Sequence, residues 1–206
     1  MFRCWASVIL ALIVTATYVT SFPGSYAIQR RASKCNGYQD LCNRKYSNVT
    51  HIGAHDSFAV GKLGSLGSNQ EANVTVQLED GIRLLQIQTH ASSGHQDSNP
   101  SGLSLCHTSC ALKNGGTLES YLRQVKQFLN QNKNEVVTLV ITNPDNKPVS
   151  NFAKAFENTG LNSMAYRAKS NSISKNDWPT LQELISQNQR VVVFLDYKAD
   201  VNQAKY

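Results

Sequence analysis

The sequence predicts an α/β domain with a mostly parallel sheet, for two reasons. Two runs rich in β-branched residues, Glu135–Thr142 and Arg190–Asp196, are typical of parallel strands that are buried on both faces. Apolar residues recur at helical spacing between Leu118 and Gln131, and segments of the two kinds alternate along the chain. We therefore expect one domain of about five strands and about four helices, with its site at the carboxyl ends of the strands.

Residues 1–27 are predicted to be a cleaved signal peptide. Arg3 precedes an apolar stretch, Cys4–Val19, and Ser25-Tyr26-Ala27 has the small-x-small form of a signal-peptidase site. An uncleaved anchor is the alternative, but threonines interrupt the stretch and leave it short for a membrane span. Arg30-Arg31 could be a second, dibasic processing site, which secreted material that starts at Ile28 would exclude.

The cysteines predict disulfides. Outside the signal an even number remains, which in a secreted chain indicates two bridges. Of the three connectivities that four cysteines allow, we favour the local one because each pair brackets a short loop. A zinc site is the alternative, because His107 lies between two cysteines. The expected pairs are Cys35–Cys42 and Cys106–Cys110.

Two sequons for N-linked glycans are present, with acceptors Asn48 and Asn73. Glycans of this kind are added in the secretory pathway. The sequons, the signal and the paired cysteines therefore agree on a secreted, extracellular protein.

The formal net charge of +6 comes from basic residues that are scattered, with no run longer than two. A nucleic-acid partner is therefore not expected, and an ordinary soluble surface is the simpler interpretation. A mildly basic surface also suits a phosphate-bearing or anionic-membrane substrate. No Gly-x-Gly-x-x-Gly or P-loop sequence follows a predicted strand, so no nucleotide cofactor is expected.

The first half of the chain is predicted as follows. Residues 28–48 form a polar segment tied by the first disulfide, and Val49–Asp56 is the first strand. A glycine-rich loop, Gly61–Ser68, leads to a short helix over Gln70–Glu79. Gly81–His90 is the second strand, and residues 91–104 form a long surface loop.

The second half begins with the helix Leu118–Gln131, which Thr117 is expected to cap. Asn143-Pro144-Asp145-Asn146 ends the strand Glu135–Thr142. The remaining predicted elements are a helix over Val149–Asn158, a short strand over Leu161–Tyr166, a helix from Asp177 or Thr180 to Asn188, and the strand Arg190–Asp196.

Polar residues gather where these strands end. Gln86, Gln88 and His90 are spaced by two along one strand, so they share a face that must be polar. The structural alternative for the glutamines is a hydrogen-bonded buried layer. The full set of strand-end candidates is His55, Asp56, Gln86, Gln88, His90, Asn143 and Asp196.

Two histidines are suited to acid–base work. His55 follows the first strand, and His107 lies in the small covalent ring that the Cys106–Cys110 pair would close. One imidazole can remove a proton from a nucleophilic hydroxyl while the other protonates the leaving oxygen, with Asp56 to orient one of them. His51 lies too early in its strand, and His95 lies in the long loop.

Four motifs in order give the chain a family resemblance: Ala54-His55-Asp56-Ser57-Phe58, Gly81–Gln86, Leu105–Cys110 and Val193–Tyr197. They resemble the phosphatidylinositol-specific phospholipase C X-domain superfamily, in particular its secreted fungal PLC-like phosphodiesterases. The resemblance spans Cys35 to Tyr197 and implies a TIM-type (β/α) barrel. Residues 49–206 would supply about five of its eight strands, so the barrel domain is expected to be truncated at the C-terminus.

The resemblance also implies roles. His55 would be the general base that activates the inositol 2-hydroxyl, His107 the general acid at the leaving alcohol, and Asp56 the carboxylate that supports the acid. Where lipases of the family carry acidic calcium ligands or an arginine that faces the phosphate, this chain has Gln86 and Gln88. Asp196 resembles a family active-site carboxylate, and the carboxylate that would partner His55 comes from a later strand.

Two functions follow. The first is a phosphoric diester hydrolase that acts on a phospholipid or related phosphodiester through two histidines, without a cofactor or metal. The second is a non-catalytic or degenerate barrel fragment that binds a phospho-headgroup or a cell-surface ligand. In either case we expect a monomer with peripheral contact to a membrane surface.

Overall fold

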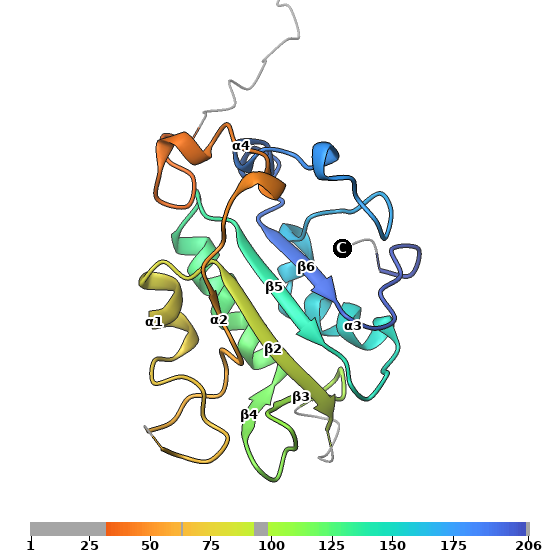
Figure 1. Ribbon diagram of the computed structural model, residues 1–206. Coiled ribbons are helices and arrows are strands. Elements are labelled where there is room, and N and C mark those ends of the chain that lie inside the picture. Colours follow the sequence, from red (N-terminus) through yellow and green to blue (C-terminus); the bar gives the residue numbers. More distant parts are fainter. Residues whose placement is uncertain (1–31, 63, 93–98, 205–206) are drawn as a thin grey trace, which may run out of the picture.

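The computed structural model describes residues 32–62, 64–92 and 99–204. The predicted signal peptide, the Arg30-Arg31 pair and His95 lie outside them. Within them, six strands form one sheet in the order β4-β3-β2-β5-β6, and β1 also pairs with β2 (Figure 1). The strands are β1 (Gly53–Ala54), β2 (Leu84–Ala91), β3 (Leu103–Cys106), β4 (Asn114–Thr117), β5 (Val137–Thr142) and β6 (Val191–Leu195).

The strands β1, β2, β5 and β6 run parallel, which confirms the predicted parallel core. β2 is bonded to β5 along Leu84–Gln88, and on its other side to β1 and then to β3. β3 and β4 form an antiparallel hairpin in place of the end of the loop predicted over residues 91–104. Leu103 and Leu105 are fully buried, so this short segment gains more by pairing with β2 than by remaining a surface loop.

Four α-helices accompany the sheet in the described residues: α1 (Val74–Glu79), α2 (Leu118–Gln131), α3 (Val149–Thr159) and α4 (Leu181–Ser186). Side-chain caps fix where three of them start. Thr117 caps α2 as predicted, and Thr180 forms a capping box with Glu183 at α4. α1 begins at Val74 rather than Gln70, because the Asn73 side chain accepts a hydrogen bond from the Val76 N–H.

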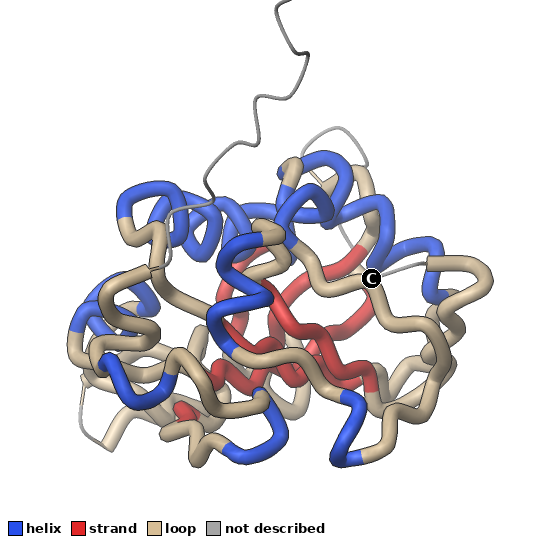
Figure 2. The backbone as a smooth tube through the Cα atoms, turned by 90° about the horizontal axis from the view of Figure 1, so that it is seen from above, coloured by secondary structure: helices blue, strands red, loops and turns tan. Residues whose placement is uncertain are grey.

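The two faces of β2 differ as predicted. Leu85 and Ile87 are fully buried in the core that the sheet forms with α1, α2 and α3. Gln86, Gln88 and His90 lie half-buried on the other face. Figure 2 shows the strands as a curved layer across the centre of the molecule, with helices and loops around them. The polar face of β2 is therefore the face on which a site can form.

A second core closes the end of the sheet where the strands begin. The first predicted disulfide, Cys35–Cys42, is confirmed. It packs there with Tyr46 and α4. In Figure 1 this segment (orange) and α4 lie at the opposite end of the sheet from the β3–β4 hairpin. The N-terminal segment thus has a structural role, away from the carboxyl ends of β2 and β5.

Two predicted strands are wrong in extent or type. The predicted strand Val49–Asp56 is reduced to Gly53–Ala54 in the structure. Gly53 pairs with Leu84, the first residue of β2, so the residues before Gly53 have no part of β2 beside them to pair with. The predicted strand Leu161–Tyr166 is mainly a 3-10 turn, Leu161–Met164, and the following residue, Ala165, forms an isolated bridge to Val191 of β6. Gly160, with φ 67°, ends α3, and the turn buries both Leu161 and Met164.

Candidate active site

His55 and Asp56 come directly after β1, where the backbone turns out of the sheet. Asp56 has a left-handed φ of 42°, and its N–H donates to Oε1 of Gln86 at 2.8 Å. The next N–H, that of Ser57, donates to the Gln86 carbonyl at 3.0 Å. The Gln70 side chain donates to the His55 carbonyl at 2.6 Å. This turn is therefore held from two sides.

His107 lies in the ring closed by the Cys106–Cys110 disulfide, which confirms the second predicted pair. With both pairs formed, these cysteine sulfurs are bonded to each other and cannot serve the zinc site considered above. The His107 N–H donates to the Lys113 carbonyl at 3.1 Å, across the hairpin. Nδ1 of His107 lies 3.0 Å from the carbonyl of Gly67, in the glycine-rich loop. This contact sets the orientation of the ring.

Asp56 brings the two histidines together. Its Oδ2 lies 3.2 Å from Nε2 of His55 and 3.5 Å from Nε2 of His107. The Asp56 side chain is 4% exposed, against 26% for His107 and 72% for His55. The Asn69 side chain donates to the same oxygen at 3.1 Å. Oδ1 of Asp56 is buried and has no hydrogen bond among the described residues. One largely buried carboxylate thus contacts both imidazoles, each of which is more exposed than the carboxylate itself.

This arrangement can divide the work of proton transfer. A protonated His107 would have an acceptor for each ring N–H, Gly67 O at Nδ1 and Asp56 Oδ2 at Nε2, and this is the form that a general acid needs. His55 is the more exposed ring and can reach a hydroxyl that enters from solvent. Both imidazoles therefore lie against one carboxylate that is itself nearly buried.

The predicted phosphate-facing glutamines make protein contacts. Oε1 of Gln88 accepts from the N–H of Thr108 at 2.6 Å, as Oε1 of Gln86 does from Asp56. The oxygen ends of both amides are therefore occupied by the backbone. No hydrogen bond from either Nε2 group is found within the described part of the chain, so these donors can still meet a ligand.

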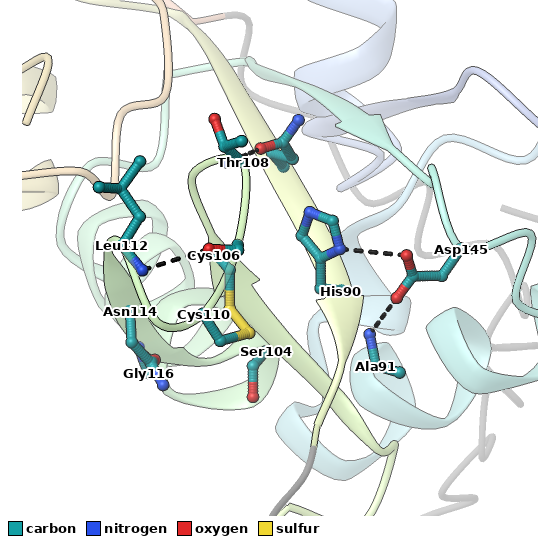
Figure 3. The surroundings of a disulfide bond; sticks show 12 residues. His90, Ala91, Ser104, Cys106, Thr108, Cys110, Leu112, Asn114, Gly116 and Asp145 are labelled. Atoms are coloured by element: carbon teal, nitrogen blue, oxygen red, sulfur yellow. Dashed lines mark hydrogen bonds and ion pairs between the residues drawn. A yellow bond between two sulfur atoms is a disulfide. The ribbon is translucent and has the colours of Figure 1, made fainter. Parts of the chain in front are cut away.

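His90 forms a separate pair with Asp145 and does not contact Asp56. Nδ1 of His90 lies 3.1 Å from Oδ1 of Asp145, while Oδ2 of Asp145 accepts from the Ala91 N–H at 2.7 Å (Figure 3). That N–H and, to a lesser degree, the His90 charge hold the pKa of the Asp145 carboxyl below its ordinary value of 3.8. Nε2 of His90 is buried and has no hydrogen bond among the described residues.

Asn143 and Asp196 form hydrogen bonds that connect the segments following β5 and β6. Asn143 is 1% exposed, and its Nδ2 donates to the carbonyls of Lys147 and Tyr197 at 2.9 and 3.3 Å. Its Oδ1 accepts from the Lys147 N–H at 2.8 Å, and Oδ1 of Asp196 accepts from the Asn143 N–H at 2.8 Å. The expectation that Asn143 binds substrate is therefore not supported, because the strand ends use its polar atoms.

Several contributors could not be found in the sequence. Asn69 and Gly67 lie in or beside a loop whose composition indicates only flexibility, and Asp145 appeared only as part of a turn. Their roles come from contacts between segments far apart in the chain. In the part of the chain that the structure describes, no group of three or more His, Cys, Asp or Glu side chains could hold a metal ion. No described helix is long and apolar enough to cross a membrane.

Comparison with known proteins gives consistent matches. The family model described as PI-PLC X 1 matches residues 41–206. The chain is 45% identical over 172 residues to an uncharacterized secreted protein of Arthroderma benhamiae, with 84% of this chain and 37% of the relative covered. It is 41% identical over 198 residues to PI-PLC X domain-containing protein 1 of the same organism, with 95% and 60% covered. The chain thus spans about two fifths to three fifths of these relatives' length.

Solved structures share the fold. The phosphatidylinositol-specific phospholipase C of Listeria monocytogenes has a TM-score of 0.54 at 18% identity, covering 76% of this chain and 54% of that one. The S. aureus enzyme has a TM-score of 0.57 at 18% identity, covering 80% and 53%. The predicted TIM-type barrel is confirmed, and the described residues form part of it. The match of the PI-PLC X model over most of the chain, with a relative at 41% identity that is named for the domain, shows that the chain belongs to the PLC-like PI-PLC X-domain family.

Proposed function

We propose that this protein is a secreted phosphoric diester hydrolase that cleaves a phospholipid or related phosphodiester with two histidines. The observation that carries the proposal is the contact of one buried carboxylate oxygen, Asp56 Oδ2, with Nε2 of both His55 and His107. Family membership and fold support it independently.

In the proposed reaction His55 removes the proton of the attacking hydroxyl, which in an inositol lipid is the 2-hydroxyl. The oxygen attacks phosphorus and the bond from phosphorus to the leaving alcohol breaks, which leaves a cyclic phosphodiester. His107 gives its Nε2 proton to the leaving oxygen, while the negative charge of Asp56 stabilises the imidazolium before transfer. Water then attacks phosphorus in a second step and opens the ring, which completes the hydrolysis. The Nε2 groups of Gln86 and Gln88 are the proposed donors to the phosphate oxygens, because an amide nitrogen can donate two hydrogen bonds. A neutral amide supplies neither positive charge nor a strong calcium ligand, so these hydrogen bonds take the place of a cation.

Exposed leucines beside the site support a lipid substrate. Leu66 is 84% exposed and Leu112 is 44% exposed. Leu66 precedes Gly67, whose carbonyl contacts His107. The loop that carries Leu112 lies against Gly67, since a Cβ added to this glycine would lie only 3.2 Å from Cγ of Leu112. Lys62 and Lys113 belong to the same two loops. Apolar tips with cations nearby are suited to an anionic membrane surface.

Secretion is part of the proposal. Both predicted disulfides are formed, and such bridges persist in oxidising compartments. A relative at 45% identity is named a secreted protein. Asn48 and Asn73 are exposed, as glycan acceptors must be. Asn73 caps α1 through Oδ1, so a glycan on its Nδ2 would leave the cap in place.

The test is hydrolysis of phosphatidylinositol in vesicles and of a soluble phosphodiester by wild type, His55→Ala and His107→Ala. Each substitution is expected to lower kcat by about 10²–10⁴-fold, the usual contribution of a positioned acid or base. His51→Ala is the matched control, because His51 packs against the Tyr46 ring and not in the site. Activity that survives both site substitutions would sink the two-histidine mechanism.

A second function is favoured by one observation, the neutral glutamines where a cation could stabilise the phosphate. A non-catalytic protein that binds a phospho-headgroup needs donors but no acid or base. Wild type that binds vesicles containing phosphatidylinositol but hydrolyses none of the phosphodiesters would support this alternative.

A further inference from the structure

Two glutamines of β2 hold the backbone directly after each proposed catalytic histidine. Oε1 of Gln86 accepts from the N–H of Asp56, which follows His55, at 2.8 Å. Oε1 of Gln88 accepts from the N–H of Thr108, which follows His107, at 2.6 Å. The same chemical group therefore makes the same contact at both histidines.

The two contacted residues share an unusual backbone conformation. Asp56 has φ of 42° and Thr108 has φ of 62°, in the left-handed region that residues other than glycine rarely adopt. Such conformations persist when the surroundings hold them, and they concentrate at functional sites. A hydrogen bond to the N–H of each residue is a direct restraint of that kind.

β2 provides a rigid base for both restraints. Gln86 and Gln88 are two positions apart, so their side chains leave the same face of the strand about 7 Å apart. β2 is paired with β5 along Leu84–Gln88 on one side, and with β1 and β3 on the other. The spacing of the two attachment points is therefore fixed by a strand inside the sheet.

We infer that Gln86 and Gln88 are positioning residues that set the separation of the two imidazoles across Asp56. The inference rests on the proposed function for its catalytic consequence, while its geometric part stands alone. It divides each amide into two roles: Oε1 holds the protein backbone, and Nε2 is the end that remains for a phosphate.

The first experiment measures amide hydrogen exchange in the full chain by NMR. Gln88→Met removes the acceptor, and the Thr108 N–H is expected to exchange about tenfold faster, the factor that corresponds to one hydrogen bond of ordinary strength. Gln88→Glu keeps an acceptor oxygen and is expected to retain the protection. Gln86→Met should speed exchange at Asp56 and leave Thr108 near its wild-type rate.

Gln124→Met is the matched control, because Gln124 is an exposed glutamine of α2 whose amide donates to the Ser120 carbonyl within the same helix. It should change neither rate. Should Gln88→Met not fold, Gln88→Asn keeps the amide but is too short to reach, and should give the same acceleration. An unchanged Thr108 exchange rate in a folded variant that lacks the acceptor would overturn the inference.

The second experiment is kinetic. Both Met variants are expected to lower kcat by about tenfold, because a displaced acid or base affects the transition state, and to raise KM as well, because the Nε2 donor proposed for the phosphate is lost with the acceptor. A loss confined to KM would assign the glutamines to substrate binding alone and overturn the positioning role. An inactive wild type would refute only the proposed function, and the exchange rates would still decide the geometry.

Discussion

Oδ2 of Asp56 lies 3.5 Å from Nε2 of His107, so the turn after β1 touches the disulfide ring after β3. The carboxylate is nearly buried, and its partner ring is fixed from the far side by Gly67. When His107 is protonated, a carboxylate buried in this way interacts with it more strongly than an exposed partner would. The two residues should therefore behave as one unit.

Asp56→Asn is expected to lower kcat by about 10²–10³-fold with little change in KM, because a neutral amide cannot stabilise the imidazolium of His107. Steady-state kinetics of the single variants and of Asp56→Asn with His107→Ala check this. The double variant should be no worse than the poorer single one. Losses that multiply would show that the residues act independently.

The two disulfides should contribute about equally to the stability of the protein, but only one of them should affect its activity. Replacing either pair with serines is expected to cost about 2 kcal/mol of unfolding free energy, since both close short loops. Only the loss of Cys106–Cys110 frees the ring that carries His107. It should reduce kcat at least about tenfold under conditions where the protein stays folded. The Cys35–Cys42 variant, altered in the N-terminal segment, is the control and should keep its kcat.

Leu66→Ser and Leu112→Ser should each weaken vesicle binding by about tenfold, because a leucine that enters lipid contributes on the order of 1.5 kcal/mol. Sedimentation with vesicles measures this. Tyr38→Ser is the control, since Tyr38 is 71% exposed and belongs to the segment at the other end of the sheet. Hydrolysis of a soluble phosphodiester should stay unchanged in all three, and a parallel loss there would point to damage of the site.

His51 should make the protein less stable in mild acid. Burial lowers its pKa below the ordinary 6.5, and its Nε2 is buried without a hydrogen bond among the described residues. Below about pH 6.5 the unfolded state therefore binds more protons than the folded state, and the free energy of unfolding falls as the pH drops.

Urea unfolding at pH 7.5 and pH 5 checks this prediction. His51→Leu should reduce the pH dependence by at most about 1.4 kcal/mol per pH unit, the limit for one proton. His55→Leu is the control, because that ring is 72% exposed, and it should leave the acid loss in place. An unaltered slope in His51→Leu would contradict the assignment.

Asn143→Ala should affect stability and not substrate affinity. Its side chain makes hydrogen bonds to Lys147 and Tyr197 in a buried position, so its loss should cost about 2–3 kcal/mol of unfolding free energy. Asn130→Ala, on the exposed face of α2, should cost far less. A raised KM with unchanged stability would return Asn143 to the substrate site.

The sequence was sufficient for several features that neighbouring residues decide, although not for the start of α1 at Val74. α2 is amphipathic and capped by Thr117, so its limits followed from local hydrogen bonding and periodicity. The two faces of β2 followed from alternation, and both disulfides from short spacing. The histidines His55 and His107 could be singled out because their residue types and flanking motifs are suited to proton transfer.

Features that depend on partners far away in the chain were set by tertiary contacts. The sequence predicted a strand over Val49–Asp56, but the register with β2 left two residues of it, and β3 formed where β2 had a free edge. The contacts of Gln86 with Asp56 and of Gln88 with Thr108 join segments whose chain separation gives no periodic signal. The residue types along the chain therefore indicated which side chains have the required chemistry. The packing of strands determined which of them meet, because hydrogen bonds between segments are set by register and not by composition.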